Sequence, residues 1–309
     1  MNRIESLQGL RALAFIGIFF SHVNAPIQWS ALGVSVFFVL SGFLLMYQHG
    51  EEAVVTGIKE RAHFAWKRIR KLYPLHIITM VLAAVLAVLI KVHAGFTLRN
   101  AFVIGAELLL NITLLQSWVP YSIINVSLNG VAWYLSAALF LYFMFPRICR
   151  FLQEKKQQTI WIICVGILVL QWAACLPMLL IFGATHPTYI WFMYCFPVFR
   201  LGDFFIGCAL GKWYATEAGQ QDIAVWKMNL MEYFLLVVTI FVHLCMRIVP
   251  SSLPLIALQN GTTLYILLAV AWIYAFAKCK GSFTRAMTQP VLIRIGNLSA
   301  YAFLIHFVV

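Results

Sequence analysis

Charged residues are scarce in this sequence, and acidic residues are the scarcest. Only 10% of the 309 residues are charged, with 10 acidic against 22 basic side chains, while 63% are hydrophobic. A soluble enzyme needs far more polar surface than this composition supplies. The scarcity of charge therefore excludes an ordinary soluble protein and predicts a chain that passes through a membrane several times.

The sequence also lacks closely spaced pairs of cysteines. The seven cysteines are scattered through apolar stretches, and no Cys-x-x-Cys occurs. We expect them to act as small packing residues, with no disulfide framework and no metal site. The formal net charge of +12 is typical of basic cytoplasmic loops facing anionic lipid when a chain is this apolar, so we expect no nucleic-acid partner.

Long apolar runs are abundant, and they set the fold class. Only helices and closed barrels pair every backbone polar group in lipid, and continuous runs favour helices. We predict an all-α polytopic membrane bundle of about nine to ten transmembrane or re-entrant helices, in one domain over residues 1–309. The predicted helices are 7–25, 31–49, 72–92, 101–118, 132–146, 160–182, 189–214, 230–249, 262–277 and a last one from Val291, which we expect to continue beyond Val309.

Two segments leave the topology open. Residues 101–118 either cross the membrane or dip in and return, and Pro197 interrupts the stretch 189–214.

The segment between Lys59 and Lys71 is rich in basic residues. By the positive-inside rule this segment is cytoplasmic, which also places the amino terminus inside the cell.

The first apolar run carries two ionisable residues, Arg11 and His22. At about 100° per residue they are separated by three turns plus about 20°, and by about 16 Å along the helix axis, so they share one face. An ionisable side chain at membrane depth is costly unless it faces protein or water. We therefore predict a polar pathway in which His22 does chemistry and Arg11 holds an anionic part of the same ligand.

Six sequence runs occur in the order found in one protein family. They are GLRALAFIGIFFSH, GVSVFFVLSGF, WKRIRKLYP, WYLSAALFLYFMFP, FRLGDFFIGCALG and IGNLSAYAFLIH. Together they resemble the membrane-bound acyltransferase 3 family of bacterial O-acyltransferases over nearly the whole chain. The resemblance implies an enzyme of the bacterial cytoplasmic (inner) membrane that moves an acyl group, usually acetyl from cytoplasmic acetyl-CoA, to a hydroxyl of a cell-surface or lipid-linked glycan. It implies acyl-CoA, a glycan acceptor and membrane lipid as partners, and no permanently bound cofactor.

The resemblance also implies roles for individual residues. Arg11 and His22 match the family's Arg-His pair. The family's cytoplasmic Arg-x-x-Arg falls on Arg68 and Lys71, where lysine keeps the charge but loses bidentate phosphate geometry, and Arg70 is a candidate to compensate. We expect these three basic residues to bind the phosphates of coenzyme A, with topology-setting charge as the alternative.

Five further residues, Glu107 among them, are candidates for the substrate pocket. Many family members carry a glutamate five residues after the tryptophan of the fourth run, and Ala138 stands there in this chain. Trp133 and Ser136 keep the rest of that motif, with packing as the alternative for both. Arg200 and Asp203, three residues apart on one helix, form either a structural ion pair or part of the site.

Glu107 is a candidate to orient His22, and His306, at the end of the last run, either belongs to the site or caps the bundle. We expect His22 to act either as a general base or as a transient acyl carrier. The competing function is a secondary transporter or exporter that uses intramembrane Arg, His and Asp residues. The sequence leaves the sugar, its hydroxyl, the acyl length and the oligomeric state open.

Overall fold

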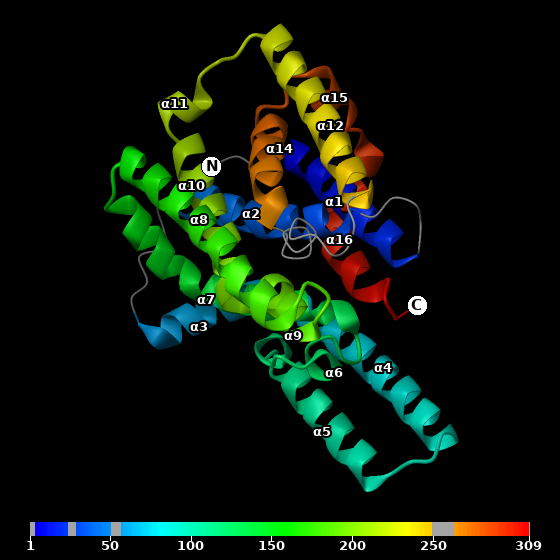
Figure 1. The fold of residues 1–309 in the computed structure, drawn as a ribbon. Helices are drawn as coiled ribbons and strands as arrows, with labels where there is room; N and C mark the ends of the chain where they lie inside the picture. Colours follow the sequence, from blue (N-terminus) through cyan, green and yellow to red (C-terminus); the bar gives the residue numbers. More distant parts are fainter. Residues whose placement is uncertain (1–3, 24–28, 51–56, 249–262, 309) are drawn as a thin grey trace.

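Every regular element that the structure describes is helical. The computed structural model describes residues 4–23, 29–50, 57–248 and 263–308, and these ranges contain no strand (Figure 1). The predicted all-α class is confirmed within them. The predicted helix ends at residues 25, 249 and 262, and the chain end at Val309, lie outside the described residues.

The long helices follow the predicted apolar runs. They are α1 (Ser6–His22), α2 (Ser30–His49), α4 (Tyr73–His93), α5 (Leu98–Ile112), α7 (Trp133–Gln153), α8 (Gln157–Phe182), α10 (Pro197–Tyr214), α12 (Val225–Ile248), α14 (Ile266–Lys278) and α16 (Pro290–Ile305). Shorter elements join them: α3 (Ile58–Ile69), η1 (Gln116–Trp118), α6 (Ser122–Asn125), η2 (Gly130–Ala132), α9 (Pro187–Ile190), η3 (Trp191–Cys195), α11 (Glu217–Gln220), η4 (Thr263–Tyr265) and α15 (Ser282–Ala286).

Six helical stretches of the described ranges are long and apolar enough to cross a membrane. They are Ser30–His49, Tyr73–His93, Gly130–Gln153, Gln157–Phe182, Pro187–Tyr214 and Val225–Met246, while α14 and α16 are apolar but shorter. The predicted number of nine to ten spans is therefore not confirmed. Helix length is one reason, because α1 has 17 residues and α5 has 15, which gives roughly 22–26 Å of helix against about 30 Å of hydrocarbon.

The ambiguous segment 101–118 does not form one continuous helix. Helix α5 ends at Ile112, and Leu114, which has a φ of 56°, turns the chain into η1. Helices α4 and α5 pack together as a hairpin at one end of the molecule (Figure 1). The segment is thus a short helix followed by a turn.

The helix break predicted at Pro197 is present. The π-helical turn η3 ends at Cys195, Phe196 is extended (φ −65°, ψ 121°), and α10 begins at Pro197. Proline disfavours helical geometry in the residue before it and has no N–H of its own, so the chain leaves the helix at Phe196. The break leaves backbone carbonyls of η3 free to accept hydrogen bonds from side chains.

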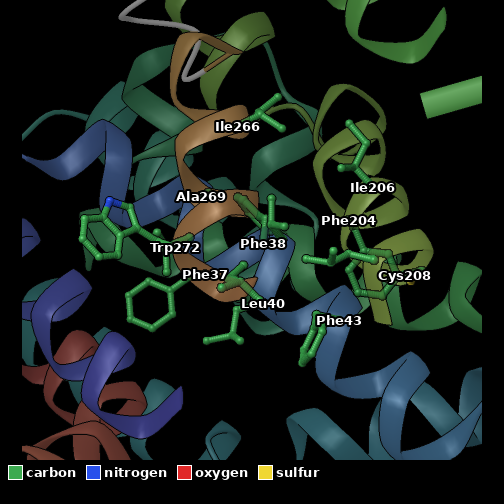
Figure 2. Packing of buried hydrophobic residues seen from close by; sticks show 14 of the residues in the cluster. Phe37, Phe38, Leu40, Phe43, Phe204, Ile206, Cys208, Ile266, Ala269 and Trp272 are labelled. Atoms are coloured by element: carbon green, nitrogen blue, oxygen red, sulfur yellow. The ribbon is translucent and has the colours of Figure 1, made fainter. Parts of the chain in front are cut away.

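Helix α2 lies at the centre of the bundle. Twelve of its 20 residues are buried, and it packs against α1, α10 and α14. Figure 2 shows that Phe38 and Phe43 of α2 belong to the same buried cluster as Phe204 of α10 and Trp272 of α14. The main hydrophobic core therefore surrounds α2.

Glycine allows α2 and α10 to approach closely. A Cβ atom on Gly42 would overlap the carbonyl oxygen of Phe204, and one on Gly207 would overlap the carbonyl oxygen of Val39. In lipid, helices associate through such close van der Waals contact, because apolar burial alone gives little preference for protein over lipid. The contact between α2 and α10 thus depends on the absence of side chains at these two positions.

Gly42→Ala should lower the free energy of unfolding by roughly 1–3 kcal/mol, because the added methyl group forces the α2 and α10 backbones apart. Thermal unfolding of the purified protein in detergent measures the change. Gly166→Ala on α8 is the matched control, since nothing lies within 4 Å of its Cβ position and alanine is the better helix former. Equal destabilisation by both substitutions would contradict the assigned contact.

Candidate active site

His22 lies at the C-terminal end of α1 and lines a cavity of about 420 Å³, the His22 cavity. Its side chain is exposed, and its Nδ1 lies 2.9 Å from the carbonyl oxygen of Ile18, one turn earlier. This contact holds the imidazole against the last turn of its own helix.

Aromatic side chains and a few neutral polar groups form the walls of the His22 cavity. Trp133, Trp191 and Tyr194 supply aromatic surface, and Ser122 and Asn125 supply polar atoms. Among the described residues that line it there is no Asp, Glu, Lys or Arg. Such a neutral, aromatic space suits an uncharged ligand whose ring can stack on an indole.

Arg11 lines a second cavity of about 70 Å³, the Arg11 cavity. Ser41 and Tyr134 also line it, with their hydroxyl oxygens 3.5 Å apart. The Nε of Arg11 is buried and has no hydrogen-bond partner in the part of the chain that the structure describes. Because a buried donor without an acceptor is costly, the Arg11 cavity suits a ligand that brings an anionic or carbonyl oxygen.

Phe303 of α16 separates the two cavities and lines both. Its ring centroid lies 5.6 Å from that of Tyr134, in the wall of the Arg11 cavity. Trp133, the residue before Tyr134, lines the His22 cavity. Arg11 and His22 thus lie on the side of α1 that faces α16, each beside its own cavity.

Comparison with known protein families gives a match over nearly the whole chain. A family model described as an acyltransferase domain matches residues 4–309. The chain belongs to this acyltransferase 3 family. It is therefore an enzyme that takes an acyl group from a donor to an acceptor, and the transporter alternative has no comparable support.

Three proteins of similar sequence are named as acyltransferases or O-acetyltransferases. Acyltransferase MdmB of Streptomyces mycarofaciens is 27% identical over 340 aligned residues, which cover 99% of this chain and 79% of MdmB. A putative O-acetyltransferase of Staphylococcus aureus (strain COL) is 36% identical over 94 residues, 29% of this chain and 15% of that protein. O-acetyltransferase OatA of Staphylococcus aureus (strain NCTC 8325 / PS 47) is 39% identical over 74 residues, 23% of this chain and 12% of OatA. No solved structure matches the chain.

The predicted donor-binding residues lie where α3 meets α4. Arg70 and Lys71 are exposed. Arg68 is half-buried, with its guanidinium carbon 3.4 Å from the centre of the Phe64 ring and its Nη1 donating to the Phe64 carbonyl oxygen at 3.1 Å. Leu72 lines the Arg11 cavity. The three basic residues therefore lie within four residues, along the chain, of a residue that lines that cavity.

Arg61, another basic residue of this segment, has a structural position. Its Nε donates to the carbonyl oxygen of Phe143 at 3.1 Å, and its guanidinium lies 4.0 Å from the centre of the Phe143 ring. Burial, and to a smaller extent Arg147, lowers the pKa of Arg61, but a guanidinium stays charged at physiological pH. Arg61 thus holds α3 against α7.

Arg200 and Asp203 form a fully buried ion pair, with 2.7 Å between Nη1 and Oδ2. Arg200 also donates to the carbonyl oxygens of Tyr194, at 2.9 Å, and of Met193. Gln171 Nε2 donates to the second carboxylate oxygen of Asp203 at 2.9 Å. Because Tyr194 lines the His22 cavity, the ion pair fixes the cavity wall without lining the cavity itself.

The other predicted pocket residues have different positions. Trp133 lines the His22 cavity, whereas Ser136, one turn further, does not. The Ser136 hydroxyl lies 2.6 Å from that of Ser117 and joins α7 to η1. Glu107 is buried on α5 but lines neither cavity, so the structure does not bring it into the site.

Sequence reasoning gave no role to Tyr134 or Phe303. Both lie inside the motif runs that carry the family resemblance, and Phe303 is three residues before His306. That spacing places Phe303 and His306 on one helix face, but periodicity alone does not show that this face meets α1. In the described part of the chain, no group of three or more His, Cys, Asp or Glu residues is arranged to hold a metal ion.

Asp203→Asn should destabilise the protein by roughly 3–5 kcal/mol, because it leaves the buried Arg200 guanidinium without its counter-charge. Thermal unfolding in detergent measures this loss. Glu154→Gln is the matched control, since Glu154 pairs with Arg150 at 3.3 Å on the exposed surface, where an ion pair contributes little. If Asp203→Asn is as stable as Glu154→Gln, the buried pair does not hold the cavity wall.

Proposed function

We propose that this acyltransferase moves an acyl group, in the first instance acetyl, from cytoplasmic acyl-CoA to a hydroxyl of a cell-surface or lipid-linked glycan. The proposal places the chain in a bacterial cytoplasmic membrane with its amino terminus in the cytoplasm. The observation that carries it is the pair of cavities on either side of Phe303, one lined by Arg11 and the other by His22.

The basic residues at the start of α4 are the proposed site for the coenzyme A phosphates. Arg68, Arg70 and Lys71 supply the positive charge that phosphate groups require, and the wall of the Arg11 cavity begins at the next residue, Leu72. The free Nε of Arg11 would then donate to a carbonyl oxygen of the pantetheine arm or of the thioester. This order directs the acyl group toward Phe303 and the His22 cavity.

His22 supplies the base at the acceptor end of this path. A neutral imidazole takes the proton of the acceptor hydroxyl as its oxygen attacks the thioester carbon. The new C–O bond forms, the C–S bond breaks, and the proton passes to the departing thiolate of coenzyme A. The same ring could instead take the acyl group first and then pass it to the hydroxyl, and the geometry is compatible with both routes.

The His22 cavity supports a neutral acceptor with several hydroxyl groups. Its tryptophans offer apolar faces on which a sugar ring can lie. Its few polar side chains can form hydrogen bonds with the hydroxyl groups of the sugar. The names of OatA and of the putative staphylococcal O-acetyltransferases agree with oxygen as the accepting atom and acetyl as the group transferred.

Two substitutions should impair the reaction at different steps. His22→Ala should abolish transfer of label from acetyl-CoA to polysaccharide or lipid-linked sugar while coenzyme A still binds, because only the base is lost. Arg68→Ala should weaken coenzyme A binding about tenfold or more, since a charge-assisted phosphate contact contributes about 1.5–3 kcal/mol. Calorimetry with coenzyme A and label counting in glycan fractions give the two readouts.

Lys59→Ala is the matched control for the donor site, because Lys59 is an exposed basic residue on the same helix α3 and lines neither cavity. Coenzyme A should bind this variant with unchanged affinity. Normal transfer by His22→Ala would refute the role of His22. Equal effects of Arg68→Ala and Lys59→Ala would reduce the donor site to general surface charge.

A further inference from the structure

His306 follows the last residue of α16 and contacts His22. Its Nε2 lies 3.3 Å from Nδ1 of His22, and the two ring centroids are 5.0 Å apart at an interplanar angle of 66°. Its own Nδ1 lies 2.8 Å from the carbonyl oxygen of Phe303. The imidazole of His306 is therefore held between a backbone acceptor on its own helix and the ring of His22.

These partners determine which nitrogen of His306 carries the proton. A carbonyl oxygen can only accept a hydrogen bond, so Nδ1 of His306 must donate to Phe303. In the neutral ring the other nitrogen, Nε2, then bears a lone pair and can only accept. His306 thus offers His22 a hydrogen-bond acceptor.

The same reasoning fixes the proton on His22. Its Nδ1 lies near two acceptors, the carbonyl oxygen of Ile18 at 2.9 Å and Nε2 of His306 at 3.3 Å. Nδ1 of His22 must therefore carry the hydrogen and share it between them. The lone pair of neutral His22 is then on Nε2, the nitrogen that a base or an acyl carrier needs free.

Aromatic packing holds the His306 ring in this orientation. The rings of Phe15 and Phe19 of α1 lie 5.9 and 6.0 Å from it between centroids, and Phe303 lies 5.6 Å from it. Three phenylalanines from two helices thus restrict rotation of the imidazole. A side chain that only filled space at the end of α16 would not need its nitrogens aligned with two separate partners.

We propose that His306 is a positioning residue for acyl transfer: it keeps His22 in the tautomer with a free Nε2, and it accepts a hydrogen bond from Nδ1 of His22 while Nε2 of His22 takes the proton of the acceptor hydroxyl. In hydrolases with a Ser-His-Asp triad a carboxylate has this task, whereas no carboxylate lines the described His22 cavity. His306 neither gains nor loses a proton in the step. The inference depends on the proposed role of His22 in transfer.

The test compares His306→Phe, which keeps the ring but removes the acceptor, with His306→Gln, whose carbonyl oxygen restores an acceptor. Transfer of label from acetyl-CoA to glycan gives kcat and the KM for acetyl-CoA, and thermal unfolding reports stability. His306→Phe should lower kcat roughly 10- to 100-fold at unchanged KM. His306→Gln should recover activity to within about threefold of the unmodified protein.

His93→Phe is the matched control, because His93 is also a histidine at the C-terminal end of a helix, α4, and lines neither cavity. It should transfer at the normal rate. Full activity of His306→Phe, with His22→Ala inactive, would overturn the role of His306 and leave the proposed function intact. Equal losses in His306→Phe and His306→Gln, or a loss that follows stability, would show a structural role only. Full activity of His22→Ala would overturn both proposals.

Discussion

The close contact between α2 and α10 determines how the two cavities are built. Gly42 and Gly207 let the two backbones meet, and each helix then contributes to the site from its fixed position. Helix α2 supplies Val34 to the His22 cavity and Ser41 to the Arg11 cavity. Helix α10 supplies the buried Arg200, which holds the carbonyl groups of η3 behind the His22 cavity.

A second contact, between α1 and α16, determines where the two cavities lie along α1. Arg11 and His22 lie at two levels of α1, and α16 places Phe303 between their cavities. In the proposed reaction, Phe303 would lie between a donor bound beside Arg11 and an acceptor bound beside His22.

Local chemistry in the sequence predicts part of this arrangement. Continuous apolar runs identify the helices, proline identifies the break before α10, and helical periodicity puts Arg11 and His22 on one face. The contact of that face with α16 and the pairing of His306 with His22 depend on tertiary packing between distant segments. Glu107 shows the same limit. Burial of this carboxyl is the expected way to keep it out of lipid, but the sequence does not tell that α5 places it where it lines neither cavity.

The most direct test of the account supplies the donor and the acceptor on opposite sides of one membrane. Right-side-out vesicles from a bacterium expressing the chain are loaded with radiolabelled acetyl-CoA, and the label in glycan on the outer surface is counted. We predict that label reaches the outer glycan from acetyl-CoA sealed inside, and that vesicles carrying His22→Ala show none. Label that reaches the outer glycan only when acetyl-CoA is added outside would contradict a path from the Arg11 cavity to the His22 cavity.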